Sequence, residues 1–298
     1  PFPELNQELP YINIMHHLKV KGIPVPTLYC YDSMKGFLFL EDFSDTTLAQ
    51  WLQGKSYSEK KAMYTKAIDI LLAMQSPDDL EHKTDCIAFK RAFNADKFLW
   101  ELDFFTENML FRLLNLDIAL KELLLMRAHF VYICETLERQ PMCFTHRDYH
   151  SRNLMVLQGE ELGVLDFQDA RLGLCQYDLA SLLMDSYFVL GEVLIEELLD
   201  YYLGCIEKLE ARPLNEKEFR RIFYLTAIQR NLKAVGTFAY KMVQHRNNQY
   251  LKFIPQTLQY LWGNFKRFPE LNPLQETLRF YLDILPGVKE VDNTTISY

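Results

Sequence analysis

Three polar side chains have the types and the spacing that phosphoryl transfer needs. Asp148 and Asn153 lie five residues apart in the pattern His-x-Asp-x-x-x-x-Asn, and Asp166 follows Asn153 by 13 residues. A loop carboxylate such as Asp148 can accept a proton from an attacking hydroxyl. The amide oxygen of Asn153 and the carboxylate of Asp166 are hard ligands, which Mg²⁺ prefers when substrate phosphates complete its shell. The pattern indicates phosphoryl transfer from a magnesium–nucleotide complex to a hydroxyl.

Loops that carry such chemistry need strands on either side to hold them. Apolar runs at 142–145, 154–157 and 162–166 predict three short strands, and the polar residues stand at their ends or in the loops between them. We therefore expect the catalytic and metal-binding loops to lie within residues 144–169, inside a compact β block.

The rest of the chain predicts a short β-containing start followed by helices. Residues 27–31 and 37–40 predict two strands joined by turn-forming residues, and therefore a hairpin. Asp45 or Thr46 can cap a short helix that carries Leu48, Trp51 and Leu52. Periodic apolar residues predict further helices at 11–21, 58–75, 94–114, 117–139, 177–188, 191–209, 215–244, 248–266 and 273–284. The predicted fold class is α+β. Residues 1–43 form a first part with a helix, a hairpin and a hinge, and residues 44–298 form a helical body with a small β insert.

The composition argues against several classes of protein. The chain has 298 residues and only 11 glycines, with neither a GxGxxG fingerprint nor a GxxxxGK[ST] loop, which argues against a Rossmann dinucleotide enzyme and a P-loop NTPase. The formal net charge of −8 argues against a general nucleic-acid binder. Six scattered cysteines without a CxxC pair predict buried thiols in a reducing compartment, the cytoplasm. Acidic residues interrupt the most apolar stretch, 179–199, so no membrane span is predicted, and nothing indicates an obligate protein partner.

Several stretches resemble the aminoglycoside-phosphotransferase and choline-kinase branch of kinase-like enzymes. They are residues 37–42, 100–105, 146–155, 165–170, 177–183 and 229–236. Within that branch they are most similar to the sugar kinases that act on the anomeric hydroxyl of N-acetylmuramate and N-acetylglucosamine in cell-wall recycling. The resemblance implies a protein-kinase-like two-lobe fold with a mostly helical large lobe, ATP as the phosphoryl donor, Mg²⁺, and a small-molecule sugar as the acceptor.

The resemblance also implies a role for individual residues. Asp148 would be the catalytic base, and Asn153 and Asp166 would be the metal ligands. Backbone groups near Glu41, Asp42 and Phe43 would meet the adenine. The resemblance further implies a structural His146 under the catalytic loop, Asp178 bracing that loop from the following helix, and candidate substrate-binding residues Glu101, Arg152, Asp169 and Arg230.

The start of the chain departs from the family. The first strands and the loop that covers the ATP phosphates should precede the first helix, but that helix begins by about Leu9. We therefore expect an incomplete N-terminal lobe, with the sequence truncated upstream of Pro1. The main functional hypothesis is an ATP-dependent sugar kinase. Two alternatives remain: a kinase of an aminoglycoside or a choline-like amino alcohol, and a catalytically inert kinase-like binding module.

Simpler interpretations exist for several of the singled-out side chains. His146 could be a catalytic acid or a metal ligand, and with Cys143 and His150 it could form a transition-metal site, although a fourth donor is not evident. Glu101 could be a surface helix residue. Arg230 could belong to a solvated helical stripe with Lys233. Asp178 could act only as an N-terminal helix carboxylate, which is compatible with bracing the loop.

Overall fold

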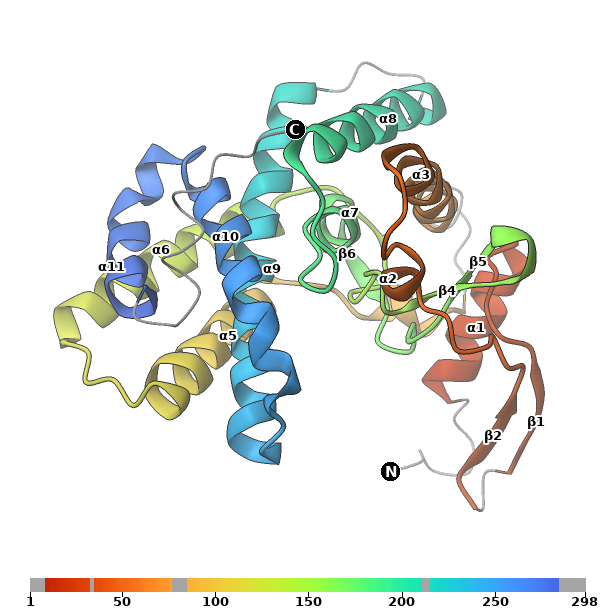
Figure 1. Ribbon diagram of the computed structural model, residues 1–298, viewed down its shortest axis with the longest axis horizontal. Coiled ribbons are helices and arrows are strands. Elements are labelled where there is room, and N and C mark those ends of the chain that lie inside the picture. The colour runs from red at the N-terminus through yellow and green to blue at the C-terminus, as the bar shows by residue number, and fades with distance from the viewer. Residues whose placement is uncertain (1–8, 33–34, 77–84, 211–214, 284–298) are drawn as a thin grey trace. The chain divides into compact units, whose positions relative to one another are not determined.

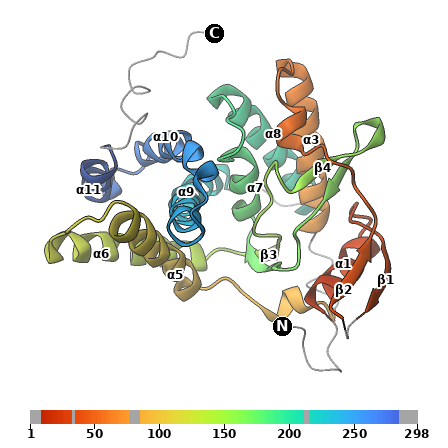
Figure 2. The ribbon, with the colours of Figure 1, turned by 60° about the horizontal axis from the view of Figure 1, so that its bottom comes forward.

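The computed structural model describes residues 9–32, 35–76, 85–210 and 215–283, and its chain folds as two compact units. Unit 1 comprises Pro1–Ala92 and Pro141–Glu216, and unit 2 comprises Phe93–Gln140 and Lys217–Tyr298. The helices and strands, labelled in Figure 1 except for β3, which Figure 2 labels, are α1 (Pro10–Val20), β1 (Leu28–Asp32), β2 (Phe37–Leu40), α2 (Leu48–Trp51), α3 (Tyr57–Met74), α5 (Ala95–Phe105), α6 (Leu120–Glu138), β3 (Met142–Thr145), β4 (Leu154–Val156), β5 (Leu162–Val164), β6 (Arg171–Leu174), α7 (Gln176–Leu183), α8 (Glu192–Glu210), α9 (Glu216–His245), α10 (Ile254–Phe265) and α11 (Asn272–Leu282).

Unit 1 begins with α1 and the hairpin of β1 and β2, which Figure 1 draws side by side. Pro24 and Pro26 keep the connecting segment extended, and the two strands then pair antiparallel with Tyr31 opposite Leu38. The predicted helix and hairpin are therefore confirmed. The predicted boundary near residue 43 falls inside unit 1, and a separate lobe formed by residues 1–43 stays a prediction.

The β block consists of two separate two-stranded sheets rather than three neighbouring strands. β4 pairs antiparallel with β5, whereas β3 pairs antiparallel with β6, a strand that the sequence did not predict. The short Arg171–Leu174 segment contains Gly173 and shows no alternation, so its strand character comes from pairing with β3. β5 ends at Val164 because Asp166 has a φ of 64°, in the left-handed region, which a strand cannot accommodate.

Two local signals decide where helices begin and end in unit 1. Capping boxes start α2 at Thr47 and α3 at Ser56, where each hydroxyl and a side chain three residues later satisfy free N–H groups. α7 was predicted to continue to residue 188 but ends at Leu183. The carboxylate of Asp185 accepts a hydrogen bond from the backbone N–H of Tyr187, which replaces helical bonding there.

The described residues of unit 2 form helices and connecting loops without a strand, and Figure 2 shows α5, α6, α9, α10 and α11 together. The predicted helix 94–114 is α5 followed by a π-helical segment, Thr106–Leu113. The close approach of α5 and α9 depends on Gly236, since a Cβ there would lie 2.6 Å from the Cα of Phe105.

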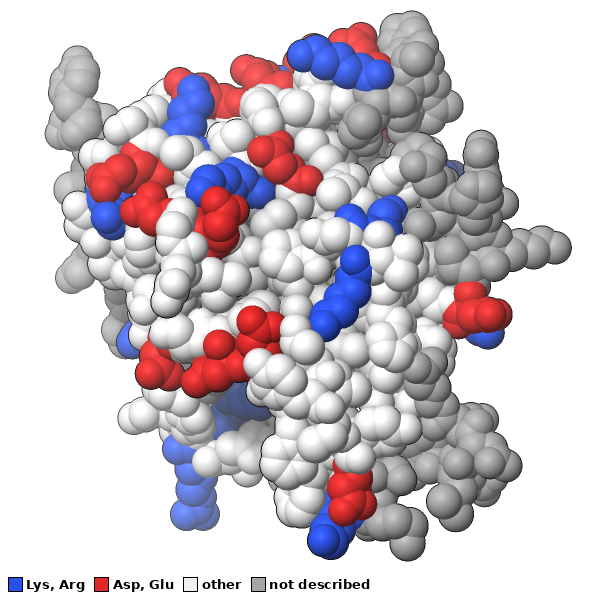
Figure 3. Space-filling model, turned by 90° about the vertical axis from the view of Figure 1, so that its right-hand side faces the viewer, with Lys and Arg blue, Asp and Glu red and all other residues white. Residues whose placement is uncertain are grey.

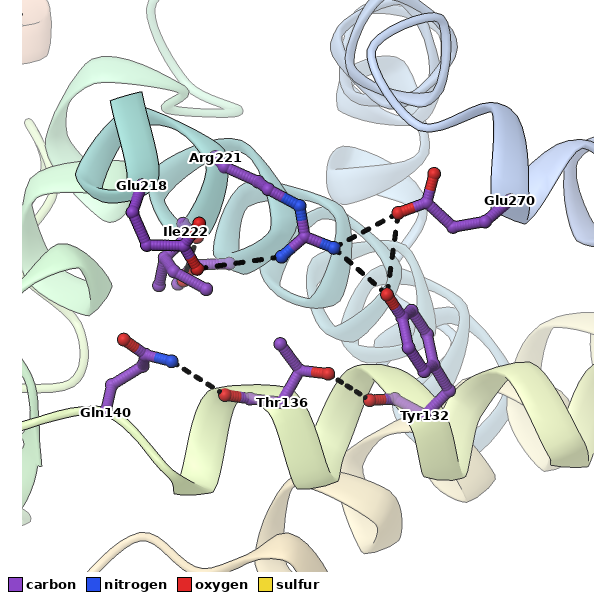
Figure 4. Close-up of polar contacts among 8 residues, drawn as sticks. Tyr132, Thr136, Gln140, Glu218, Arg221, Ile222 and Glu270 are labelled. Atoms are coloured by element: carbon purple, nitrogen blue, oxygen red, sulfur yellow. Dashed lines mark hydrogen bonds and ion pairs between the residues drawn. The ribbon is translucent and has the colours of Figure 1, made fainter. Parts of the chain in front are cut away.

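A polar cluster joins three helical segments of unit 2 (Figure 4). The guanidinium of Arg221 on α9 donates to the hydroxyl of Tyr132 on α6 over 3.0 Å and to Glu270 over 3.1 Å. Glu218, one turn away, lies 3.7 Å from the same guanidinium. All these groups are partly exposed, so the cluster fixes how the helices meet and contributes little net charge–charge free energy.

The surface charge and the polarity of the helices also bear on the class of protein. On the face drawn in Figure 3, acidic and basic side chains of the described residues are interspersed among uncharged ones, without a continuous basic stripe. Within the described part of the chain, every helix is too short or too polar to cross a bilayer. The architecture, mostly helical with a few short antiparallel strands, agrees with the predicted α+β class.

Candidate active site

The loop that follows β3 is held from behind by the first turn of α7. The carboxylate of Asp178 accepts hydrogen bonds from the backbone N–H of His146 over 2.5 Å and of Arg147 over 2.9 Å. Arg147 has a φ of 83°, a left-handed conformation that a non-glycine residue adopts only when its surroundings hold it there. Asp178 therefore lies in the first turn of α7, where a carboxylate is favoured, and also bonds the loop, so the two roles considered for it are compatible.

The buried ring of His146 links this loop to the segment before Asp166. Its Nε2 lies 2.9 Å from the carbonyl oxygen of Leu165, and its Nδ1 accepts from the N–H of Asp148 over 3.4 Å. Both bonds form in the tautomer that carries the proton on Nε2. The ring therefore ties two backbone segments together, which supports the structural role that stays a prediction for His146.

The three residues of the sequence pattern come together at the end of the loop. The amide nitrogen of Asn153 donates to the backbone carbonyl of Asp148 over 2.8 Å and to the carboxylate of Asp166 over 3.3 Å. The N–H of Leu165 donates to the carbonyl of Asn153 over 2.9 Å, so β5 and the loop are locked in register. Since the Asn153 nitrogen makes both side-chain bonds, its Oδ1 is the atom available to ligate a metal.

The donor set at Asn153 and Asp166 fits a magnesium ion. Asp166 is exposed, its side chain is oriented by a 2.7 Å hydrogen bond from Gln168, and both candidate ligands offer hard oxygen atoms. Among the described residues, no three or more His, Cys, Asp and Glu side chains are grouped so as to hold a metal. Cys143, His146 and His150 therefore form no transition-metal site in this structure, whereas one amide and one carboxylate suffice where phosphates complete the shell.

The hinge after β2 is ordered by its own side chains. The carboxylate of Glu41 accepts a hydrogen bond from the backbone N–H of Thr27 over 3.0 Å. Hydrogen bonds from the side chain and the backbone of Thr27 hold the pKa of Glu41 below its ordinary value. Asp42 accepts from the N–H of Ser44 over 2.8 Å. The buried ring of Phe43 packs against Gly163 of β5, where a Cβ would collide with it. The proposed adenine-contacting backbone is therefore anchored to the sheet.

Two candidate substrate residues of unit 1 make defined contacts near the loop. The guanidinium carbon of Arg152 lies 4.0 Å from the centre of the Tyr187 ring. Asp169 lies 3.5 Å from a guanidinium nitrogen of Arg147, and its side chain is 59% exposed. Arg152 belongs to the same loop as Asp148, whereas Asp169 belongs to the segment between β5 and β6 and reaches that loop through Arg147.

The other two candidates, Glu101 and Arg230, belong to unit 2. Glu101 is only 2% exposed, so it is not a surface residue. Its carboxylate accepts from Gln229 over 2.9 Å and lies 4.0 Å from the ammonium group of Lys233. Lys233 is only 17% exposed, so a solvated stripe does not describe this face of α9; Arg230 is half-buried. The side-chain amide oxygen (Oε1) of Gln229 is buried and has no hydrogen-bond partner among the described residues.

Three polar residues that were not predicted as site residues support the site. Gln168 bonds Asp166, and Gln229 bonds Glu101. Asp185 bonds Ser151, in the loop between Asp148 and Asn153. A signal existed for Asp185, because it is a charged residue inside the apolar stretch 179–199, but it was used only to argue against a membrane span. Gln229 begins the stretch 229–236 that resembles the family, but its partner Glu101 is 128 residues away, so the sequence does not reveal their contact.

Comparison with known sequences agrees with this geometry. A family described as the phosphotransferase enzyme family matches residues 2–214. An N-acetylmuramate/N-acetylglucosamine kinase of Neisseria meningitidis is 31% identical over 281 residues, which are 93% of this chain and 80% of that protein. A protein of the same name from Pseudomonas aeruginosa is 31% identical over 276 residues, covering 90% of this chain and 77% of its own.

Solved structures share the fold. The choline kinase LicA of Streptococcus pneumoniae aligns with a TM-score of 0.58 at 16% identity, over 87% of this chain and 82% of that one. The ADP-bound aminoglycoside phosphotransferase APH(2'')-Ib aligns with a TM-score of 0.54 at 18% identity, over 86% and 82%. The resemblance drawn from the sequence motifs and the protein-kinase-like fold class are both confirmed.

Proposed function

This chain belongs to the phosphotransferase enzyme family, and from that premise we propose that it is a sugar kinase. The reaction proposed is transfer of the γ-phosphoryl group of ATP to the anomeric hydroxyl of an N-acetylated amino sugar, N-acetylmuramate or N-acetylglucosamine. The names and coverage of the curated relatives support this acceptor. By the same relationship the enzyme would act in the cytoplasm, on sugars recovered from the cell wall.

One observation carries the proposal: the side-chain amide of Asn153 bonds the backbone carbonyl of Asp148 and the carboxylate of Asp166 at once, which brings the two loops that carry these residues together. Asp148 would orient the acceptor hydroxyl and accept its proton. Asn153 and Asp166 would hold Mg²⁺, which when bound neutralises charge on the transferring phosphoryl group. The residues of the hinge, Glu41, Asp42 and Phe43, would contact the adenine through their backbone groups.

The acceptor would be recognised by charged and polar side chains. The sugar ring offers hydroxyl and amide groups, and N-acetylmuramate also a carboxylate, which pair with carboxylates, amides and guanidinium groups. Arg152 and Asp169 in unit 1, and Glu101 and Arg230 in unit 2, have suitable chemistry. Their assignment as substrate-binding residues is part of the proposal.

The test is a panel of acceptors offered to the purified chain with Mg²⁺ and ATP. The panel holds N-acetylmuramate, N-acetylglucosamine, an aminoglycoside and choline, with ADP release as the rate measurement and ³¹P NMR to identify the phosphorylated hydroxyl. We expect anomeric sugar phosphates and no product from the amino alcohols. Asp166→Ala serves as the matched inactive variant, and equal rates with that variant would mean that the product does not come from this site.

The same panel separates the alternatives. Turnover of the aminoglycoside or of choline alone would overturn the sugar-kinase proposal and favour an amino-alcohol kinase. Calorimetric titration with Mg²⁺ and ATP adds a second readout, since neither turnover nor binding of ATP would favour an inert binding module.

A further inference from the structure

The catalytic loop receives a second buried carboxylate beyond Asp178. Asp185 stands just after the end of α7 and is 2% exposed, while Asp178 in the first turn is fully buried. Asp178 bonds the backbone on the N-terminal side of Asp148, at His146 and Arg147. Asp185 bonds the same loop on the C-terminal side of Asp148, which leaves Asp148 between two fixed points.

Asp185 makes three hydrogen bonds, all to groups that donate. Its Oδ2 accepts from the backbone N–H of Ser151 over 2.9 Å and also from the Ser151 hydroxyl. Its Oδ1 accepts from the N–H of Tyr187 over 2.8 Å. Both oxygens of an ionised carboxylate accept hydrogen bonds and neither donates, so an ionised Asp185 can satisfy all three donors.

Ser151 is the residue through which these bonds reach the reactive groups. It lies between Asp148 and Asn153, and its own carbonyl accepts from the N–H of Ala49 over 3.0 Å. Asn153 in turn donates to the carbonyl of Asp148 over 2.8 Å. The segment 148–153 is therefore held at its middle from both sides, by Asp185 and by α2.

The hydrogen bond from Asp185 to Tyr187 also affects the neighbours of the Tyr187 ring. The Tyr187 ring contacts the guanidinium of Arg152, 4.0 Å away, and the ring of His150, whose centre is 4.9 Å away. Asp185 fixes the backbone of Tyr187, so it also sets where this ring meets Arg152. Both neighbours of Ser151 are thus placed by contacts that start at one carboxylate.

Keeping a charge here costs free energy of folding. Burial raises the pKa of Asp185 to about 6, while the hydrogen bonds from Ser151 and Tyr187 and the charge of Arg152 oppose that rise. A neutral side chain of similar size would avoid the desolvation penalty. What the carboxylate adds is a fixed set of acceptors beside a loop that contains the left-handed residue Arg147.

We propose that Asp185 is a positioning residue for phosphoryl transfer: by holding Ser151 and Tyr187 it sets the separation of Asp148 and Asn153 and the place of Arg152. The inference rests on the proposed kinase function for its catalytic consequence. Its structural part, that Asp185 immobilises residues 148–153, stands on the contacts alone.

The decisive variant is Asp185→Asn, which keeps the size but turns one acceptor toward Tyr187 into a donor. We expect kcat to fall by about tenfold to a hundredfold, since displacement of reacting groups by about 1 Å has effects of that order. The KM values for ATP and for the sugar should change less than about threefold, because their contacts remain. Ser151→Ala should give a smaller loss, and the double variant should be no slower than Asp185→Asn, because both act through one contact.

A matched control separates positioning from stability. Tyr202→Phe in unit 1 removes another buried hydrogen bond, from the Tyr202 hydroxyl to Gln75, whose amide bonds the carbonyl of Cys175 rather than the backbone of residues 146–156. It should lower the melting temperature to a similar degree with kcat within about twofold of the wild type. A kcat loss in Tyr202→Phe equal to that in Asp185→Asn, or an unchanged kcat in Asp185→Asn, would overturn the proposal.

Hydrogen–deuterium exchange provides a readout that needs no activity. Across residues 146–156, exchange should be faster in Asp185→Asn than in the wild type and unchanged in Tyr202→Phe. If the wild-type chain phosphorylates no sugar, the proposed function is wrong. The exchange rates still test whether Asp185 immobilises the loop. Exchange that is unaltered in Asp185→Asn shows that Asp185 does not hold the loop.

Discussion

Units 1 and 2 bury carboxylates against different partners. In unit 1, Asp178 and Asp185 accept mainly from backbone N–H groups of the catalytic loop and its flank. In unit 2, Glu101 accepts from the side chain of Gln229 and pairs with Lys233, both on a neighbouring helix. Backbone bonding fixes the path of a loop that helical hydrogen bonds cannot reach, whereas side-chain bonding joins helices whose backbones are already satisfied.

This difference predicts where each kind of damage will appear. The loops of unit 1 contain the left-handed residues Arg147 and Asp166, which need external support. Changes there should reduce turnover more than stability. Changes in the helical packing of unit 2 should reduce stability and leave the turnover of folded molecules alone.

The largest effect, on kcat, is expected at Asp148, the proposed catalytic base. Asp148→Asn removes the proton acceptor but keeps the size of the side chain and its backbone bonds, so kcat should fall by about a thousandfold. The melting temperature should stay within a few degrees of the wild type. Steady-state ADP release and thermal unfolding measure the two quantities, and near-wild-type turnover would remove Asp148 from the mechanism.

The next effect is one of stability and belongs to unit 2. Gly236→Ala places a Cβ 2.6 Å from the Cα of Phe105, so α5 and α9 must separate. We expect the free energy of unfolding to fall by about 3 kcal/mol, the upper end of the usual cost of overpacking, measured by urea denaturation. Gly263→Ala is the matched control, because nothing lies within 4 Å of a Cβ there, and it should stabilise α10 by about 0.5–1 kcal/mol. Equal effects of the two changes would contradict the close approach.

The third effect concerns pH and the charge buried at Asp185. Its pKa in the folded protein, about 6, is above its ordinary value of 3.8, so the folded state keeps a proton that the unfolded state has released. Its contribution to stability is full below about pH 4 and is lost as the pH rises through 6. Relative to Asp185→Asn, the wild type should therefore lose about 2–3 kcal/mol between pH 4 and 7. Parallel pH profiles of urea unfolding for the two proteins would show that the shift is absent.

The smallest effect concerns the hinge of unit 1. In Gly163→Ala the added Cβ meets the ring of Phe43, which must move and shift the backbone of residues 41–43. The KM for ATP should rise by about threefold to tenfold, a loss of up to about 1.4 kcal/mol, with the KM for the sugar unchanged. Gly204→Ala, where a Cβ meets nothing within 4 Å, controls for the extra methyl group. An unchanged KM for ATP in a folded Gly163→Ala protein would place the adenine elsewhere.

Much of the fold was predictable because its signals are local. The hairpin, α3 and α8 follow from alternation or helical periodicity, and their bounds fall within a few residues of the prediction. β6 was missed because its four residues become a strand only through pairing with β3. The end of α7 was misplaced because the side chain of Asp185 captures a backbone N–H, an interaction that competes with the helix.

The sequence by itself determined which residues we propose to carry the reaction. Asp148, Asn153 and Asp166 are recognisable because their chemistry depends on residue type and short spacing, and both survive in a linear pattern. Only the tertiary structure decided how they are held. The contacts of Asp185 with Ser151 and of Glu101 with Gln229 join residues 34 and 128 positions apart. Burial and hydrogen-bond direction arise from packing between such distant segments, so no local pattern encodes them.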